Sequence, residues 1–296
     1  MNPYLQADTI ARAEALGIQA RTVVEGLRVG DHPSPYRGFS VEFVQHREYV
    51  PGDDLRHIDW RVYGRVERYT IKQYEQETNF IGHLLLDASR SMLYGDDLEN
   101  KLEYAKLLAA TLAFVVIHQR DSVGLNVSDT TWRLQVPPSS QPGQIHNVLR
   151  ALVEVRPEGP TAIGPLLHEL AEKVRRRGLV FLISDCFDDV TQVLSGLRHL
   201  RFAGHEVTLF HVLHEDEVDF PFEGMVKFDG LERREVLRTR PQMIRPTYLK
   251  ALQKYLVELQ AGCEVEKVDY VRLVTARPLA GPLSEYLHRR QRIRRL

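Results

Sequence analysis

The stretch "FIGHLLLDASRSM", residues 80–92, decides the fold. An apolar run of strand length ends in the carboxylate of Asp87, and hydroxyl side chains follow at Ser89 and Ser91. A short apolar run of this kind is typical of a strand that is buried on both faces of a parallel sheet. Ligands of such sheets bind at the carboxyl ends of the strands. The polar residues after this run are therefore the first candidates for a functional site.

The sequence that follows alternates between predicted strands and predicted helices. Apolar residues at helical spacing predict a helix over 99–118, and "SVGLNV" with "TWRLQV" predicts a hairpin over 122–136. Two more buried strands are expected at 178–185 and 205–213, each after a helical segment. Alternation of this kind requires crossover connections between the strands. We therefore predict an α/β fold with a doubly wound, mainly parallel sheet that is covered by helices on both faces.

The ends of the chain add elements to this core. A helix is predicted over 5–28, and two or more short strands are predicted within 38–78, around the turn "PGDD" at 51–54. We therefore divide the chain into an N-terminal helix/β extension, residues 1–78, and a main domain, residues 79–296.

The C-terminal part of the main domain is predicted to be an addition of strands and helices. "MVKFDG" and "REVLRT" have the composition of short strands, and a helix is predicted over 247–260 with Gly262 as its stop. A late strand, "VDYVRLVTA", and a last helix over 282–292 complete the sequence.

Composition and charge exclude several classes of protein. Apolar residues make up 43% of the 296 residues, which is enough for a large core, and the net charge of -1 argues against nucleic-acid binding through bulk charge. The two cysteines, Cys186 and Cys263, lie far apart and predict neither a disulfide framework nor a cysteine metal site. No signal peptide is recognisable, and the longest apolar run, residues 107–117, is too short to span a bilayer. A cytoplasmic location is expected.

Carboxylate and hydroxyl side chains follow several of the predicted strands and loops. They are Asp87, Ser89 and Ser91 after the first strand, Thr161 in the loop "EGPTAIG", and Asp185 at the end of "FLISD". Such oxygens suit a hard divalent cation, Mg²⁺ or Mn²⁺, and a site with two acids can also accept a carboxylate from another molecule. The alternative is that the same residues only cap turns and helices. Both interpretations stay open on the residues alone.

This pattern closely resembles the von Willebrand factor A domain and its metal-ion-dependent adhesion site. In that family the first strand ends in Asp-x-Ser-x-Ser, a later loop supplies a Thr, and a further strand ends in an Asp. The resemblance implies a complete set of metal ligands, formed by Asp87, Ser89, Ser91, Thr161 and Asp185. The sequence departs from the family at Cys186, where many relatives have Gly.

The segment just before the first strand resembles a more specific family. "GFSVEFVQHREYVPGDDLRHIDWRVYGR", residues 38–65, is similar to the signature of the bacterial domain-of-unknown-function family fifty-eight. The shared motifs are Glu-Phe, Arg-x-Tyr, Gly-Asp-Asp-x-Arg and Ile-Asp-Trp, followed by a von Willebrand-like domain. Members of this family are typically associated with MoxR-type AAA+ ATPases, which implies a partner or adaptor role. Many members also carry N-terminal membrane helices. None is recognisable in this sequence, so the resemblance does not imply a membrane location.

The same segment contains a second group of candidate residues. Its charged side chains are Asp53, Asp54, Arg56, Asp59 and Arg61. One interpretation is a surface on which the protein partner docks. The other is a turn with internal ion pairs, in which a buried Trp60 anchors the extension to the main domain.

The sequence fits the known enzyme classes of this fold type poorly. A phosphoryl-transfer enzyme of the haloacid dehalogenase type needs Asp-x-Asp after the first strand, and here Ser89 occupies the second position. The sequence has neither a glycine-rich phosphate loop nor a Gly-x-Ser-x-Gly elbow. His211 and His214, with the acidic residues after them, are poorly spaced for a metal on a strand. We expect them at the solvent end of a strand, followed by a solvated loop.

The sequence therefore predicts a non-enzymatic, metal-dependent protein-interaction module. It is expected to bind Mg²⁺ or Mn²⁺ and to act as an adaptor for a MoxR-type ATPase in the assembly or maturation of a protein complex. The alternative function is a Mg²⁺-dependent hydrolase that acts on phosphate esters. A third class, an interaction module with a vestigial site, would lack some of the metal ligands.

Overall fold

The computed structural model describes most of the chain. The described residues are 14–24, 43–49, 59–66, 68–74, 80–96, 100–232 and 235–294. The chain forms two compact units, one made of residues 1–35 with 81–296 and the other of residues 36–80. We describe each unit separately.

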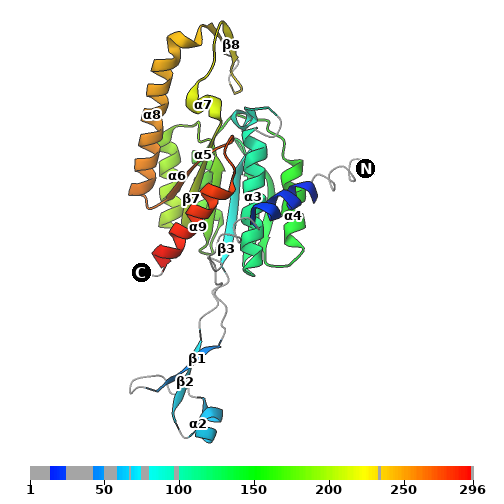
Figure 1. The fold of residues 1–296 in the computed structure, drawn as a ribbon, viewed down its shortest axis with the longest axis vertical. Helices are drawn as coiled ribbons and strands as arrows, with labels where there is room; N and C mark the ends of the chain where they lie inside the picture. Colours follow the sequence, from blue (N-terminus) through cyan, green and yellow to red (C-terminus); the bar gives the residue numbers. More distant parts are fainter. Residues whose placement is uncertain are drawn as a thin grey trace. The chain divides into compact units, whose positions relative to one another are not determined.

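A six-stranded sheet forms the centre of the larger unit (Figure 1). Its strands are β3 (Ile81–Asp87), β4 (Ser122–Ser128), β5 (Trp132–Ser139), β6 (Leu179–Ser184), β7 (Glu206–Leu213) and β10 (Asp269–Val274). They lie in the order β10-β7-β6-β3-β4-β5, and every neighbouring pair is parallel except β4 and β5. The predicted doubly wound, mainly parallel sheet and its hairpin are thus confirmed.

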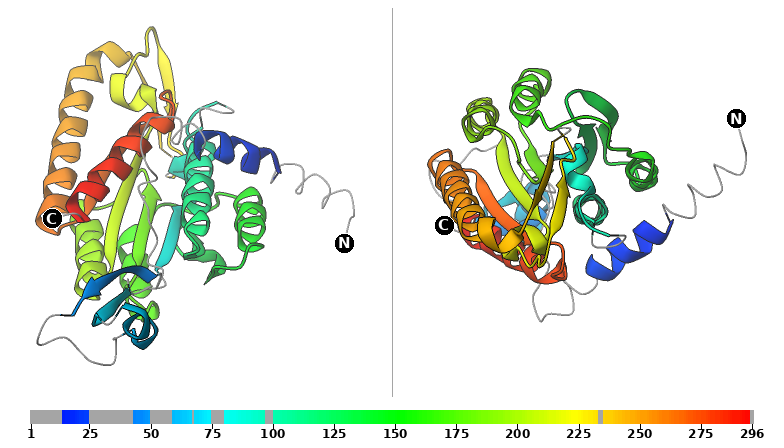
Figure 2. Two further views of the ribbon diagram at one scale, coloured as in Figure 1. Left: turned by 60° about the horizontal axis from the view of Figure 1, so that its bottom comes forward. Right: turned by 90° about the horizontal axis from the view of Figure 1, so that it is seen from above.

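Helices cover both faces of this sheet, as predicted. They are the 3-10 helix η2 (Arg90–Leu93), α3 (Lys101–His118), α4 (Gln144–Glu154), α5 (Ile163–Lys173), α6 (Val190–Phe202), α7 (Glu215–Asp219), α8 (Pro241–Val265) and α9 (Ala280–Arg294). The view down the sheet in Figure 2 shows α5 and α6 on one face and α3 and α9 on the other. Alternate strand residues therefore face different helices. Leu182 contributes to the core beneath α5 and α6, whereas the Phe210 ring lies 5.1 Å from that of Tyr286 in α9.

The order of the strands creates a switch point between β3 and β6. From β3 the chain crosses to β4 on one side, and it later returns to form β6 on the other side. The loops after β3 and β6 therefore lead to opposite sides of this point, and ligands of doubly wound sheets bind at such carboxyl ends. Asp87 ends β3 and Asp185 follows β6, so both candidate carboxylates lie at this switch point.

The chain between β7 and α8 adds a small substructure at the same edge. It consists of α7 and an antiparallel hairpin of β8 (Val226–Asp229) and β9 (Val236–Thr239). Figure 1 shows α7 and β8 beyond the carboxyl ends of the central strands. The two short strands were predicted. Their position beside the candidate site was not.

The helix α8 is longer than the sequence predicts. It begins at Pro241, because proline suits the first turn of a helix, where its missing N–H costs nothing. It also continues past Gly262, where the sequence predicts that the helix ends. A Cβ atom at Gly262 would lie 2.2 Å from Leu194 Cδ1 of α6. This glycine therefore allows two helices to approach closely, and it does not end one.

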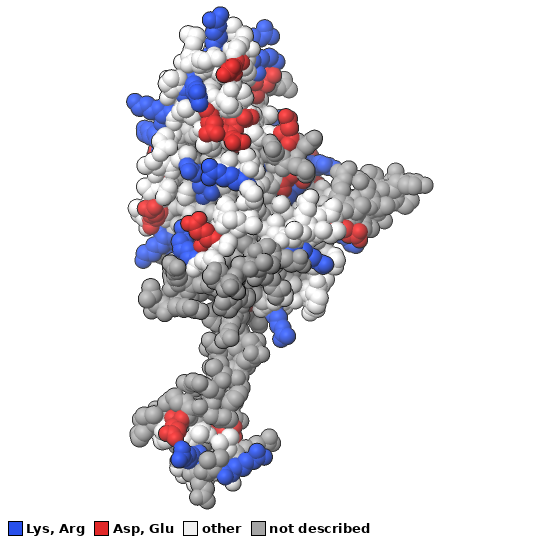
Figure 3. Space-filling view, viewed as in Figure 1, with Lys and Arg blue, Asp and Glu red and all other residues white. Residues whose placement is uncertain are grey.

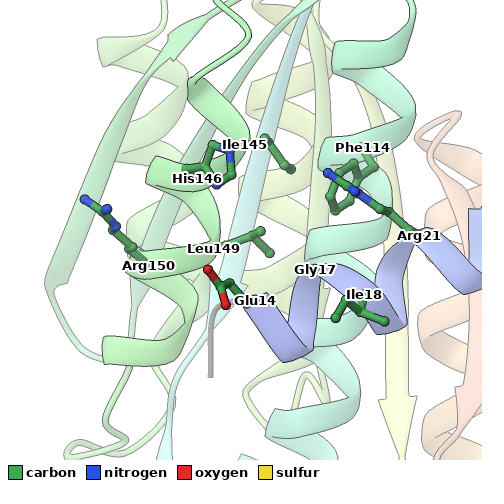
Figure 4. Close-up of a pocket in the computed structure, with 9 residues that line it drawn as sticks. All are labelled: Glu14, Gly17, Ile18, Arg21, Phe114, Ile145, His146, Leu149 and Arg150. Carbon is green, nitrogen blue, oxygen red and sulfur yellow. The ribbon is translucent and has the colours of Figure 1, made fainter. Parts of the chain in front are cut away.

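Within the predicted N-terminal helix, residues 14–24 are described and helical. The guanidinium carbon of Arg21 lies 5.4 Å from the centroid of the Phe114 ring in α3. A pocket of about 280 Å³ lies between this helix, α3 and α4. Figure 4 shows the side chains that line it, among them Glu14 of this helix and Arg150 of α4. The helix thus packs against the helices of the central sheet.

The smaller unit contains an antiparallel pair, β1 (Phe43–Glu48) and β2 (Thr70–Tyr74), and the helix α2 (Trp60–Val66). Asp59 precedes α2 and accepts a hydrogen bond from Val62 N at 3.3 Å, which caps the helix. Trp60 is 62% exposed, so it is not buried in the core of the smaller unit. Arg61 lies in α2. Asp53, Asp54 and Arg56 lie outside the described residues.

The surface of the described residues carries charges of both signs. Figure 3 shows Lys and Arg side chains interspersed with Asp and Glu side chains, and acidic side chains gathered in the region of α7. None of the helices in the described part of the chain is long and apolar enough to cross a bilayer.

Two buried histidines predict how the stability of the fold depends on pH. Burial, and to a smaller extent His205, lowers the pKa of His83 in β3 to about 4. The unfolded chain therefore takes up a proton at a pH where the native His83 cannot. We expect the free energy of unfolding to decrease as the pH falls from about 6.5 to about 4.

The His83→Leu variant removes this proton uptake. Between about pH 7 and about pH 5, the wild type should lose about 2 kcal/mol more stability than the variant. Urea denaturation at several pH values measures this difference. His146→Leu is the control, because His146 is exposed and should leave the pH profile unchanged. Parallel profiles for the wild type and His83→Leu would contradict the assignment.

Candidate metal centre

Three hydroxyl groups converge at the switch point. Ser89 Oγ lies 3.0 Å from Ser91 Oγ, and Ser91 Oγ lies 3.3 Å from Thr161 Oγ1. The two serines come from the turn after β3, and Thr161 comes from the loop before α5. The structure thus brings together residues that are 70 positions apart in the sequence.

Asp87 is buried beside these hydroxyls. Its carboxylate accepts hydrogen bonds from Ser89 N at 2.8 Å and from Ser184 Oγ at 2.6 Å. Burial and the nearby charge of Asp185 raise the pKa of Asp87 to about 7, although these hydrogen bonds oppose the rise. The negative charge of the ionised Asp87 carboxylate is therefore only partly compensated by its hydrogen bonds. Ser184 was not among the predicted site residues, and its position at the end of an apolar strand is the signal that could have identified it.

Asp185 is fully buried and pairs with a lysine that the sequence analysis missed. Lys101 Nζ lies 2.7 Å from Asp185 Oδ2 and 2.7 Å from Glu217 Oε1 of α7. Burial alone would lower the pKa of Lys101, but the attraction of the two carboxylates outweighs burial and raises it. The ammonium group therefore stays charged and joins α3, the end of β6 and α7.

The sequence does carry a signal for Lys101. It is the first residue of α3, after Asn100, whose side chain accepts a hydrogen bond from Leu102 N at 2.9 Å. A cation in the first turn of a helix is unfavourable to the helix dipole. Such a lysine needs an anionic partner, and the sequence does not reveal which one.

The histidines at the end of β7, His211 within the strand and His214 just after it, do not lie in solvent, so the prediction for them is wrong. His211 is fully buried, with Nδ1 2.8 Å from Tyr270 Oη and Nε2 2.8 Å from the carbonyl oxygen of Asp185. His214 caps α7 by accepting a hydrogen bond from Asp216 N at 3.1 Å. The acidic run that follows is this helix, and it supplies Glu217 to Lys101.

Thr161 binds a carboxylate from the β8–β9 hairpin. Its hydroxyl donates to Glu232 Oε1 at 2.6 Å, and its backbone N–H donates to the same oxygen at 3.0 Å. The alternative that Thr161 caps α5 is wrong, because Ala162 occupies the N-cap position and the Asp188 carboxylate accepts the hydrogen bond of Ile163 N at 3.0 Å. The Thr161 hydroxyl therefore belongs to the site, where it bonds Glu232, and not to a helix cap.

The donor set fits a divalent cation that prefers oxygen. In the described part of the chain, no three His, Cys, Asp or Glu side chains form a metal-binding group. A cation here would depend on Ser89, Ser91 and Thr161 together with Asp87 and Asp185. Hydroxyl and carboxylate oxygens of this kind suit Mg²⁺ and Mn²⁺.

The charges of the site also favour a divalent cation. The described contacts of the site include four carboxylates and one ammonium, that of Lys101, which pairs with two of them. The carboxylates are those of Asp87, Asp185, Glu217 and Glu232. A divalent cation would offset most of this excess negative charge. The site has the composition of a cation-binding site rather than of an anion-binding one.

The fold and this site define the class of the protein. It is an α/β protein with a doubly wound, mainly parallel sheet, in which hydroxyls and carboxylates meet at the carboxyl edge of the sheet. Residues 45–256 match the model of the family described as "Protein of unknown function DUF58", and the chain belongs to this family. The predicted family is confirmed.

Relatives in the mycobacteria carry no assigned activity. The chain is 27% identical to the uncharacterized protein Rv1480 of Mycobacterium tuberculosis and to the uncharacterized protein Mb1516 of Mycobacterium bovis. Each alignment covers 75% of this chain and 70% of the relative.

Solved structures with a similar arrangement include the conserved hypothetical protein BatB from Bacteroides thetaiotaomicron. It is 22% identical with a TM-score of 0.47, over 71% of this chain and 98% of that one. The VWA domain of SpRpn10 is 13% identical with a TM-score of 0.40, over 71% of this chain and 95% of that domain.

The Lys101 ion pairs should contribute strongly to stability. Lys101→Met leaves two buried carboxylates without their cation, which we expect to cost about 3–5 kcal/mol in the free energy of unfolding. Urea denaturation at neutral pH measures this loss. Lys106→Met in the same helix is the matched control, because its partner Glu103 is 49% exposed and such pairs contribute about 0–1 kcal/mol. Equal losses for the two variants would contradict the structural role of Lys101.

Proposed function

We propose that the protein is a non-enzymatic interaction module that binds Mg²⁺ or Mn²⁺ and, through it, an acidic side chain of a partner. The ligands to the cation are Asp87, Ser89, Ser91, Thr161 and Asp185. The observation that carries the proposal is the row of three hydroxyls beside the buried, under-neutralised carboxylate of Asp87. When bound, the cation offers a coordination position that a carboxylate of another protein can fill.

The residues of the chain have separate parts in this binding. Ser184 and the backbone N–H of Ser89 orient the Asp87 carboxylate. Lys101 holds Asp185 in place and compensates part of the negative charge, so that the site does not depend on the cation alone for its structure. The hydroxyls supply neutral oxygens, which leave a bound cation with enough charge to attract an external carboxylate.

The partner that we propose is a MoxR-type AAA+ ATPase or the client protein of that ATPase, during the assembly or maturation of a complex. This part of the proposal is supported by membership of the DUF58 family. A cytoplasmic location is also part of it. The two cysteines, Cys186 and Cys263, are free and buried, which fits a reducing compartment.

A phosphate-ester hydrolase is the less favoured function. Such an enzyme would need an acid–base group close to Asp87, and Ser89 occupies that place with a hydroxyl that lies 3.0 Å from another hydroxyl. An assay with a generic phosphate ester and Mg²⁺ separates the two functions. Turnover that Asp87→Asn abolishes would replace the interaction module with the hydrolase.

Calorimetric titration of chelator-treated protein with Mg²⁺ and Mn²⁺ tests the metal site. We expect about one cation per chain in the wild type and at least about tenfold weaker binding in Asp87→Asn, because the amide keeps the shape but loses the charge. Asp189→Asn is the matched control, since Asp189 caps α6 on the surface and Asn caps a helix equally well. A folded wild type that binds neither cation would refute the metal-dependent mechanism.

A further inference from the structure

The β8–β9 hairpin places a carboxylate where the proposed partner would place its own. Glu232 Oε1 accepts both hydrogen bonds that Thr161 can donate, one from the hydroxyl and one from the backbone. The 2.6 Å distance to the hydroxyl is short, as is usual when a hydroxyl donates to an ionised carboxylate. Thr161 is one of the proposed cation ligands, so this carboxylate lies at the edge of the cation site.

The described strands of the hairpin have few buried contacts. No residue of β8 or β9 is buried, and Val236 and Leu237 are 57% and 52% exposed. The base is better anchored, because the Phe228 ring stacks on that of Phe220 at 5.7 Å. A segment with few buried contacts opens at a small cost in free energy. The hairpin can therefore withdraw Glu232 without disturbing the core.

Glu232 is also chemically suited to this position. Glu232 lies 71 positions after Thr161 in the sequence. It belongs to the β8–β9 hairpin, which is not part of the central sheet. The ammonium of Lys101 is already shared by Asp185 and Glu217. Among the described residues no lysine or arginine pairs with Glu232, so a metal ion bound near Thr161 would compensate its charge.

We propose that Glu232 is an internal ligand that occupies the carboxylate position of the cation site and must leave before a partner can bind. This inference rests on the proposed function. The partner then competes with a carboxylate of the protein itself, so it must present an acidic side chain and also favour the displaced hairpin. The hairpin thereby sets the apparent affinity of the site for any external carboxylate.

The competition is measurable with a simple carboxylate. The probe is acetate, and the signal is the broadening of its methyl proton resonance by protein-bound Mn²⁺. Glu232→Ala should bind acetate about tenfold more tightly than the wild type, because a site that is open for about a tenth of the time loses a factor of ten in apparent affinity. Electron paramagnetic resonance of free Mn²⁺ gives the metal stoichiometry in the same samples.

Two further variants isolate the cause. Glu235→Ala removes the same charge from the same hairpin at an exposed residue, and we expect it to bind acetate as the wild type does. Glu232→Asp keeps the charge but shortens the side chain by one methylene, so its acetate affinity should also rise. Thermal denaturation verifies that each variant folds.

The outcomes separate the two proposals. If Mn²⁺ binds to the wild type and to Glu232→Ala, but both bind acetate equally, Glu232 is not an internal ligand and the metal-dependent function stands. If Glu235→Ala gains as much acetate affinity as Glu232→Ala, the effect is one of general charge and the inference also fails. If the wild type does not bind Mn²⁺, the proposed function fails and the inference fails with it.

Discussion

The carboxyl edge of the sheet is organised by the repulsion between two buried carboxylates, those of Asp87 and Asp185. They come from neighbouring strands, and the low dielectric of the interior makes the repulsion costly. One lysine and several hydrogen bonds compensate for part of it. Lys101 supplies a fixed positive charge to Asp185, whereas Asp87 receives only hydrogen bonds. The position of the remaining negative charge therefore marks where a cation is needed.

The sequence predicted the parts of this site that depend on strand ends. A buried strand must stop where its polar residues begin, so Asp87, Ser89, Ser91 and Asp185 could be assigned to one edge of the sheet once the alternation of strands and helices was recognised. Thr161 followed from the loop that opens a helix. The geometry that joins them comes from the switch point between β3 and β6, which is a property of strand order.

The residues that complete the site could not be predicted in this way. Lys101 pairs with carboxylates that are 84 and 116 positions away, and no local pattern encodes such distances. The prediction that the helix ends at Gly262 is wrong for a similar reason. Glycine after an apolar helical pattern usually ends a helix, but here the close approach of Leu194 requires it. In both cases a tertiary contact overrides the local signal.

The same charge balance explains why a lysine and an exchangeable cation can serve different purposes in one site. The ammonium of Lys101 is covalently attached and buried, so it holds α3, β6 and α7 together at all times. An ammonium group donates hydrogen bonds and has no coordination position that an external carboxylate could fill, and two of its three N–H groups already donate to Asp185 and Glu217. A metal ion bound beside Asp87 has no such restriction. In the proposed function, Lys101 therefore has a structural role and the metal supplies the exchangeable position, and the hairpin that carries Glu232 would act only on the metal.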